Sequence, residues 1–340
     1  MSEADRYREA GVDLDAAERA KSRMAAAVSS THTRLTVGGF GAFGGMVRIP
    51  DDLDRPTLVM STDGVGTKVL VAIAVGRHDT VGEDLVNHSV NDILVHGATP
   101  LAFLDYIAGS RLETETVASL VEGVARGCRN HEMSLAGGET AQMPDLYHQG
   151  HYDLAGTIVG VVEEQKALHG DRVERGNALI GYASNGLHTN GYTLARHIFF
   201  DELALEVDSI VPEIGETAGD ILLTVHTSYR AAVAPVLDRI NCLAHITGGG
   251  IQGNLPRSLP AGCGARIDKA SWTIPPLFRL LQESGKVEEA EMFRVFNMGV
   301  GMIAAAPSDQ VSAVCQQAKA VGINAWVVGE VVDGEGVEIA

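Results

Sequence analysis

The sequence predicts a mixed α/β (α+β) fold in two domains. Apolar runs typical of strands alternate with amphipathic stretches typical of helices, once before about residue 163 and again from residue 178. The charged stretch Glu163–Gly176 separates the two series, so we expect domains at 1–168 and 169–340. A chain of 340 residues is long enough to give each domain a hydrophobic core.

The order of the predicted elements follows from the same patterns. An alanine-rich helix is expected at Ala16–Val28. The first series has strands at Thr57–Ser61, Leu101–Ile107, Ser134–Leu135 and Leu154–Val162, with helices near 79–96 and 113–128. The second series has strands at Ala178–Ala183, Val300–Ala305 and Ala325–Val332, with helices near 192–204, 217–229 and 231–240.

The composition argues against several function classes. The net charge of -18 makes nucleic acid or an anionic membrane a poor main partner, because both require basic patches. No apolar run approaches the roughly 20 residues of a membrane span, and Met1–Ala10 lacks a signal-peptide core. The cysteines form no CxxC pair, so we expect a reducing, cytoplasmic location and no structural zinc site.

The segment Asp63–Lys68 (DGVGTK) is the most informative motif of the chain. It follows the predicted strand Thr57–Ser61, and its glycines permit backbone conformations that side chains forbid. Strand ends are where α/β proteins bind ligands. The Asp63 carboxylate could hold a cation while the Lys68 ammonium meets a phosphate of a nucleotide. The alternative is a strand-to-helix turn with a solvated lysine.

The glycine-rich segment Gly38–Gly45 contains the pattern GxGxxG, at Gly39, Gly41 and Gly44. A dinucleotide-binding fold needs a helix to begin at such a loop. Two prolines before the strand at Thr57 leave no room for that helix, so we exclude this fold. The backbone amides could instead surround phosphate oxygens, and the alternative is a surface loop.

The predicted helix near 79–96 carries polar residues beside an apolar stripe. A spacing of seven places Asp84 and Asn91 on one face, with Asp92 next to it. His88 is four residues from both acids, a spacing that would permit metal ligation. A solvated or hydrogen-bonded histidine is the favoured interpretation.

The segment Gly137–Thr140 (GGET) repeats the arrangement of glycines and an acid after a strand. The acids Asp63, Asp92 and Glu139 would together supply hard oxygen ligands for Mg²⁺ that bridges polyphosphate oxygens. The chain has no Walker A motif, so it is not a P-loop enzyme.

In the second series, Ser184–Tyr192 joins a predicted strand to a predicted helix. It places His188 and Asn190 near a helix N-terminus, which suits a phosphate or an amide. Thr247–Gly250 and Asn297–Gly301 are two further loops with little side-chain bulk. An ordinary turn is the alternative for each, but five glycine-rich loops in one chain favour a ligand site.

Together these motifs resemble those of the phosphoribosylformylglycinamidine cyclo-ligase family, the aminoimidazole ribonucleotide (AIR) synthetases of purine biosynthesis. The similar segments are Tyr7–Ala16, Gly38–Gly45, Ser61–Lys68, His78–Tyr106, Gly137–His148, Asp153–Thr157, His188–Arg196, His245–Arg257 and Phe296–Ile303. Departures are local. His88 stands where an apolar or small residue is expected and Met298 where a cysteine is common, so neither receives a role.

The resemblance implies an AIR-synthase-like fold in which N-terminal domains pair across a homodimer to form a β-barrel, with an α/β C-terminal domain. It implies ATP-dependent closure of formylglycinamidine ribonucleotide to AIR through an O-phosphorylated (iminophosphate) intermediate. ADP and phosphate are the other products. ATP is expected in a cleft lined by both domains.

Residue roles complete these expectations. The residues expected to bind ATP are Gly39, Gly41, Gly44, Asp63, Gly64, Thr67, Lys68, Asp92, Gly138 and Glu139, with Mg²⁺ on Asp63, Asp92 and Glu139. Those expected to bind the ribonucleotide are His188, Asn190, Gly248, Gly249 and Gly250. Catalysis is assigned to His188, Asn190 and Lys68. A neutral His188 could accept the proton lost on ring closure, and a protonated one could stabilise a phosphate.

Other ATP enzymes of the same fold share these acids, namely selenophosphate synthetase, thiamine-phosphate kinase and formylglycinamidine synthetase. The first has a reactive cysteine or selenocysteine near its N-terminus, whereas the first cysteine here is Cys128, and the third is far longer. A nucleotide-binding regulatory protein without turnover is a different class. The presence of Asp63, Lys68, Asp92 and Glu139 together argues against it.

Overall fold

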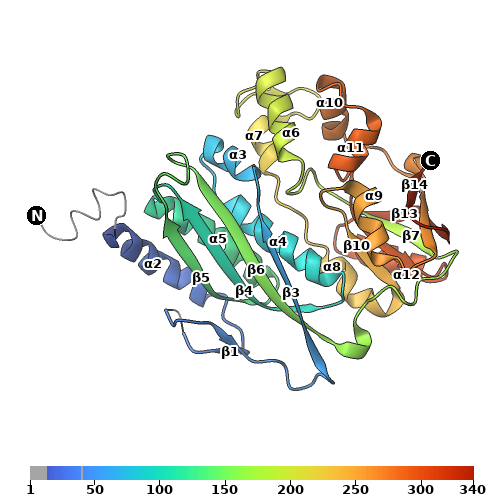
Figure 1. The fold of residues 1–340 in the computed structure, drawn as a ribbon, viewed down its shortest axis with the longest axis horizontal. Coiled ribbons are helices and arrows are strands. Elements are labelled where there is room, and N and C mark those ends of the chain that lie inside the picture. Colours follow the sequence, from blue (N-terminus) through green and yellow to red (C-terminus); the bar gives the residue numbers. More distant parts are fainter. Residues whose placement is uncertain (1–13, 40) are drawn as a thin grey trace, which may run out of the picture. The chain divides into compact units, whose positions relative to one another are not determined.

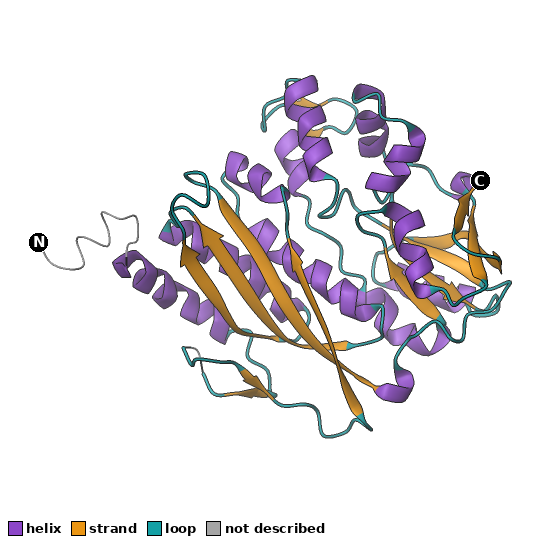
Figure 2. Ribbon diagram, in the orientation of Figure 1, coloured by secondary structure: helices purple, strands orange, loops and turns teal. Residues whose placement is uncertain are grey.

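The computed structural model describes residues 14–39 and 41–340, which form two compact units (Figure 1, Figure 2). The first comprises Met1–Ser89 and Thr99–Glu163, and the second comprises Val90–Ala98 and Glu164–Ala340. The segment Val90–Ala98 of the second unit includes the end of helix α4 (Asp79–Leu94), which the sequence placed in the first domain. The segments Met1–Ala10 and Tyr7–Ala16 and the residue Phe40 of the glycine-rich loop lie wholly or partly outside the described residues.

The first unit is built on a four-stranded sheet in the order β3-β6-β4-β5. β3 (Pro56–Gly64), β6 (Tyr152–Glu163) and β4 (Thr99–Gly109) pair antiparallel, and β5 (Ser134–Gln142) pairs parallel with β4. A parallel pair needs a crossover, which α5 (Thr114–Asn130) supplies. The four strands predicted for this half are confirmed, and each is longer than its apolar run.

Helices cover one face of this sheet (Figure 1). α4 (Asp79–Leu94) and α5 lie over strand residues such as Phe103 and Ile107, which are fully buried. The two helices approach closely at Gly123, where a Cβ atom would lie 1.9 Å from the Asp79 carbonyl oxygen. Among its described residues, the unit also contains α2 (Leu14–Ser29), which lies beside α5, and α3 (Lys68–Val75). The helices predicted near 79–96 and 113–128 are confirmed as α4 and α5.

A short hairpin precedes the sheet in sequence. β1 (Thr36–Val37) pairs antiparallel with β2 (Met46–Val47), so the glycine-rich segment Gly38–Gly45 is a hairpin loop. No helix begins among its described residues. A loop between two antiparallel strands differs from the strand-to-helix turn that a dinucleotide-binding motif requires.

The second unit contains a six-stranded sheet in the order β10-β12-β7-β13-β11-β14. Neighbouring strands are antiparallel except for the pair β11 and β14. Their bounds are β7 (Ala178–Ala183), β10 (Cys242–His245), β11 (Cys263–Ile267), β12 (Val300–Ala306), β13 (Ala325–Asp333) and β14 (Val337–Ile339). The neighbours Leu179 and Ile180 belong to different hydrophobic clusters, so both faces of the sheet are covered.

Short helices and one small hairpin complete the second unit. The helices are α6 (Tyr192–Arg196), α7 (Ala218–Leu223), α8 (Arg230–Val233), α9 (Gly250–Asn254), α10 (Pro276–Ser284), α11 (Glu289–Val295) and α12 (Val311–Ala320). The hairpin consists of β8 (Ile210–Val211) and β9 (Glu216–Thr217). Within the described part of the chain, no helix has the length and apolar character needed to cross a membrane.

Three helix predictions in this half need correction. The helix expected at 217–229 ends at Leu223, because residues 224–229 form a loop whose backbone contacts a distant part of the chain. The helix near 192–204 changes to a π-helical turn at His197–Glu202. The helix near 231–240 changes to a 3₁₀ turn at Ala234–Arg239, where Pro235 cannot donate a backbone hydrogen bond.

Candidate functional site

Asp63 is an accessible acid at the end of an edge strand. It lies one residue before the end of β3, and its side chain is 37% exposed. Gly66, at φ +71°, then turns the chain toward α3. The Asp63 Oδ2 atom lies 3.4 Å from Nε2 of His88, so His88 has a partner within the first unit. A reachable carboxylate at this place suits Mg²⁺, which binds carboxylate oxygens.

Lys68 is a buried ion-pair partner. Its side chain is 0% exposed, and Nζ lies 2.9 Å from Oδ1 and 2.8 Å from Oδ2 of Asp84, which is equally buried. Burial lowers the pKa of Lys68, and the charge of Asp84 opposes that shift. The interpretation of a solvated lysine is therefore wrong. A contact between Lys68 and a phosphate stays a prediction.

The strand register separates Asp63 from Glu139. Along one row across the sheet, Asp63 faces Gly156, Gly156 faces Asp105, and Asp105 faces Gly138. Three interstrand spacings, roughly 14 Å, therefore lie between Asp63 and the residue before Glu139. Side chains alternate between faces, so Glu139 points to the face opposite Asp63. Within one unit, the two acids are not placed to bind the same ion.

Asp105 is a candidate residue that the sequence analysis missed. Burial raises the pKa of its carboxyl to about 7. The Cys128 thiol is also buried, which raises its pKa, and the charge of Asp105 adds to that shift. A Cβ atom at Gly138 would lie 2.2 Å from Asp105 Oδ1, so only glycine leaves room for this carboxyl. The signal was a single acid inside the apolar run Leu101–Ile107.

The hairpin loop with the glycine pattern is open. Apart from the adjacent residues in the chain, no described atom lies within 4 Å of the positions that a Cβ would occupy at Gly39, Gly41 and Gly44. Gly41 has φ +95°, which favours glycine. Gly45 fixes the base of the loop against β5, since a Cβ there would lie 2.2 Å from the Ala136 carbonyl oxygen. The described glycines of this loop are exposed, and backbone amides in such a loop can bind an anion.

Asn91 and Asp92 lie in the part of α4 that belongs to the second unit. Asn91 Oδ1 accepts a hydrogen bond of 2.9 Å from the Tyr229 backbone amide, and Nδ2 donates one of 2.8 Å to the Thr227 carbonyl. Asp92 Oδ1 lies 2.8 Å from Nδ1 of His245. The sequence analysis did not select His245. Ligation of Mg²⁺ by Asp92 stays a prediction.

His188 lies in the loop after β7 in a strained conformation. Its φ is +62°, which is uncommon for a residue other than glycine, and its side chain is buried. Its ring stacks on His226, with centroids 4.0 Å apart and an angle of 21° between planes. Only glycine at position 301 leaves room for the rings of His188 and Tyr229, because a Cβ there would lie 2.6 Å from His188 Cε1 and 2.0 Å from Tyr229 Oη.

The predicted ribonucleotide residues are close together in the second unit. The Gly248 amide donates a 3.0 Å hydrogen bond to Asn190 Oδ1. Gly249 has φ +98°, and a Cβ atom at Gly250 would lie 1.8 Å from a backbone oxygen. Asn254, which the sequence analysis missed, donates to the carbonyls of Gly248 and Gly250 at 3.2 and 2.9 Å. These contacts hold the loop Gly248–Gly250 in place within the second unit.

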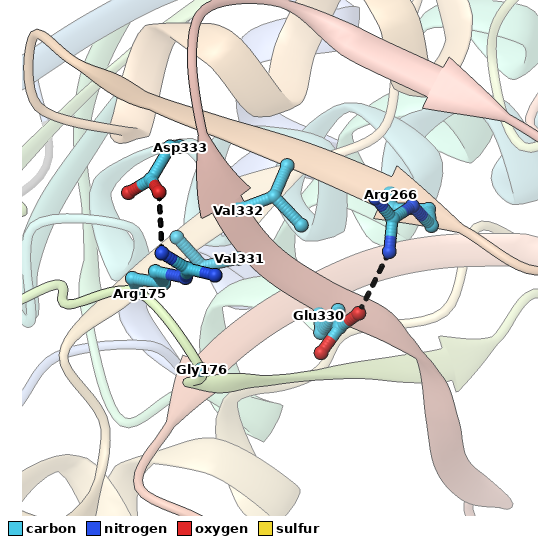
Figure 3. A pocket seen from close by; sticks show the side chains of 7 residues that line it. All are labelled: Arg175, Gly176, Arg266, Glu330, Val331, Val332 and Asp333. Atoms are coloured by element: carbon cyan, nitrogen blue, oxygen red, sulfur yellow. Dashed lines mark hydrogen bonds and ion pairs between the residues drawn. The ribbon is translucent and has the colours of Figure 1, made fainter.

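A depression of about 280 Å³ on the second unit is a different feature (Figure 3). Its charged side chains neutralise one another. Arg175 lies 2.6 Å from Asp333, and Arg266 lies 3.1 Å from Glu330 (Figure 3). None of the predicted site residues lines it. This depression is therefore not the candidate site.

Comparison with known proteins identifies the family. Residues 44–162 match the N-terminal domain of AIR synthase related proteins, and residues 174–340 match the C-terminal domain. The phosphoribosylformylglycinamidine cyclo-ligase of Desulfatibacillum aliphaticivorans is 47% identical over 334 residues, 97% of this chain and 96% of the relative. The chain belongs to the phosphoribosylformylglycinamidine cyclo-ligase family. It is therefore an enzyme of the ligase class, and the resemblance noted in the sequence is confirmed.

A second cyclo-ligase and two solved structures are also similar to this chain. The cyclo-ligase of Pseudothermotoga lettingae is 45% identical over 330 residues, 97% of both chains. The thiamine-monophosphate kinase from Stenotrophomonas maltophilia has a TM-score of 0.70 at 16% identity, with 95% of this chain and 94% of that chain covered. Hydrogenase maturation protein HypE, solved in complex with ATP, has a TM-score of 0.63 at 16% identity, with 92% and 89% covered. At such low identity, these two structures show a shared fold.

Proposed function

We propose that this chain converts formylglycinamidine ribonucleotide and ATP to AIR, ADP and phosphate, as a step of purine biosynthesis. The observation that carries the proposal is the 47% identity to a cyclo-ligase over 97% of the chain. The glycine-rich hairpin loop, the acid of β3 and the His188 loop supply the chemical groups that the reaction needs.

The reaction has two bond exchanges. The formyl oxygen of the substrate attacks the γ-phosphorus of ATP, so a P–O bond forms while the bond to ADP breaks. The amidine nitrogen then attacks the formyl carbon, a C–N bond forms, and the C–O bond to phosphate breaks. The nitrogen loses one proton. Both steps depend on positioning and charge neutralisation more than on a covalent nucleophile of the protein.

The first unit is proposed to bind ATP and Mg²⁺. Its open hairpin loop offers backbone amides to phosphate oxygens, and Asp63 offers an accessible carboxylate to Mg²⁺, which would neutralise phosphate charge. Because the register separates Asp63 from Glu139, we assign these acids to different ions. Lys68 begins α3 and is paired with Asp84, and we propose that this pair positions the preceding turn, in which Gly64 and Thr67 would contribute to the ATP site.

The second unit is proposed to bind the ribonucleotide. Asn190 Oδ1 is already engaged by Gly248, but its buried Nδ2 atom has no hydrogen-bond partner among the described residues. A buried amide donor without a partner is uncommon and costly, so this atom suits a substrate oxygen. His188 is proposed to accept the proton of the amidine nitrogen or, when protonated, to stabilise the phosphorylated oxygen.

A homodimer is proposed from the exposed face of the first sheet. Leu58, Met60, Leu104 and Tyr106 lie on alternating positions of β3 and β4 with exposed fractions of 44%, 66%, 38% and 36%. Several large apolar side chains on one sheet face mark a surface that a partner covers. The same face of a second copy is the partner expected from the resemblance.

A coupled assay tests the proposed function. Purified protein is mixed with formylglycinamidine ribonucleotide, ATP and Mg²⁺, and ADP and AIR are measured in parallel. We expect equal amounts of both products, and no ADP when the ribonucleotide is omitted. ADP without AIR would contradict the proposal. Phosphorylation of thiamine monophosphate by the same preparation would instead identify a kinase of this fold.

A further inference from the structure

Three buried imidazoles meet in the second unit. His188 comes from the loop after β7, His226 from the loop after α7, and His245 from the last position of β10. The ring of His226 stacks on His188, and Nε2 of His226 lies 3.2 Å from Nε2 of His245. Nδ1 of His245 lies 2.8 Å from Oδ1 of Asp92. Of these three histidines, only His188 was predicted from the sequence as a site residue.

The hydrogen-bonding groups around His226 assign its protons. Oδ1 of Asn91 accepts from the Tyr229 amide, so the group that lies 3.3 Å from His226 Nε2 is the Asn91 amide NH₂, a donor. His226 Nε2 is therefore an acceptor, and its proton lies on Nδ1, which faces Thr189 Oγ1 at 3.3 Å. The Nε2 of His245 lies 3.2 Å from the same nitrogen of His226, and its Nδ1 lies 2.8 Å from Oδ1 of the Asp92 carboxylate.

The same three histidines are close enough to suggest a metal site, since one nitrogen of each lies within 4.8 Å of the others. Two contacts argue against it. The Asn91 amide directs a proton at the Nε2 atom that a metal would need. The rings of His188 and His226 are nearly parallel, at 21°, and do not converge on one point. The geometry favours a hydrogen-bonded chain from Asp92 through His245 to His226.

We infer that His226 is a positioning residue, which the chain of Asp92 and His245 orients and which holds the ring of His188 in place by stacking. This inference rests on the proposed function, in which His188 meets the ribonucleotide. The His188 backbone is strained, so a loop alone would hold its ring poorly. A ring displaced by about 1 Å from the reacting atoms loses much of its catalytic effect.

The test compares variants that keep or remove the flat ring. His226→Leu removes both stacking and hydrogen bonds, and we expect kcat to fall about 10-fold or more with the KM for ATP unchanged. His226→Phe keeps a ring for stacking and should recover at least about half of that loss on a logarithmic scale. His226→Gln replaces His226→Leu if the latter does not fold. His197→Leu, at an exposed histidine, is the matched control and should behave as the parent.

A double-mutant cycle separates this inference from the proposed function. If His226 acts only through His188, then His226→Leu should change kcat by less than about 2-fold once His188→Ala is present. An equal loss in both backgrounds, or equal kcat for His226→Phe and His226→Leu, would overturn the positioning role. Unchanged kcat in His188→Ala alone would instead remove the proposed role of His188. Unfolding temperatures of all variants show whether the fold is intact.

Discussion

The two units prepare their halves of the proposed site in different ways. In the first, the predicted ligands Asp63 and Glu139 are accessible and lie at opposite edges of one sheet. In the second, His188 is buried and stacked, and Asn190 is already bonded to Gly248. Contacts within the unit hold the second set together, whereas the two acids of the first set lie on edge strands roughly 14 Å apart and point to opposite faces of the sheet. Loss of an exposed acid should therefore change function alone, and loss of a buried group should also change stability.

The largest expected effect concerns the buried pair in the first unit. Lys68→Ala leaves the Asp84 carboxylate buried without its ammonium, so we expect the free energy of unfolding in urea to fall by about 3–5 kcal/mol. The double variant Lys68→Met with Asp84→Leu removes both charges and should recover most of the loss. If Lys68→Ala cost less than about 1 kcal/mol, the pair would not be a structural part of the unit.

The second prediction concerns pH and Asp105. Its pKa of about 7 in the folded chain is above the ordinary value of 3.8, so the folded state holds a proton that the unfolded state loses. The stability contributed by this group is present below about pH 4 and is lost as pH rises to 7. Relative to the parent, Asp105→Asn should gain roughly 2–4 kcal/mol of unfolding free energy between pH 4.5 and pH 8. A difference that does not vary with pH would contradict this.

Variants at His188 and Asp63 should affect the kinetics of the two substrates differently. Because His188 is placed in the ribonucleotide half, we expect kcat to fall about 10²-fold with ATP affinity near normal. Asp63→Asn is the matched variant in the other half, and it should weaken the dependence on ATP and Mg²⁺ while leaving the ribonucleotide KM unchanged. Steady-state kinetics with each substrate varied in turn would show the two patterns. If both variants changed the kinetic parameters for ATP and for the ribonucleotide equally, the two units would not bind separate substrates.

The smallest expected effect concerns the exposed apolar face of the first unit. Met60 is the most exposed apolar residue of β3 on this face, and Met60→Asp places a charge there. The dissociation constant of the proposed dimer should therefore rise at least about 10-fold. Light scattering across a concentration series measures this. The control is Arg77→Asp, which lies outside the strand and its exposed apolar face. A monomeric parent protein at micromolar concentration would contradict the dimer.

Local sequence patterns were sufficient for most strands and for the glycine-rich loops. The period-two pattern of apolar residues in strands and the period-3.6 pattern in helices can be seen within a short stretch of sequence. The observed bounds of β3, β4, β6 and β7 are therefore close to the predicted ones. The loop at residues 224–229 could not be predicted, because Asn91, more than 130 residues away, holds its backbone. Local propensity favoured a helix there, and a long-range contact determined the structure.

The candidate site shows the same limit. The residues of the loops were visible as motifs, but their surroundings were not. Lys68 is buried because Asp84 lies beside it in the fold, and His226 meets His245 only when the loop after α7 comes to the end of β10. Asp105 was passed over because a strand pattern was sufficient to explain its neighbours. Motif reading therefore identified the groups, and only the structure showed which of them contact one another.

The most direct test of the central claim follows one oxygen atom. Formylglycinamidine ribonucleotide labelled with ¹⁸O in its formyl group is converted by the protein with ATP and Mg²⁺, and the inorganic phosphate is examined by mass spectrometry. If the formyl oxygen is phosphorylated before the ring closes, the label must leave with phosphate, one ¹⁸O for each AIR formed. Unlabelled phosphate, with the ¹⁸O found in water, would contradict the account.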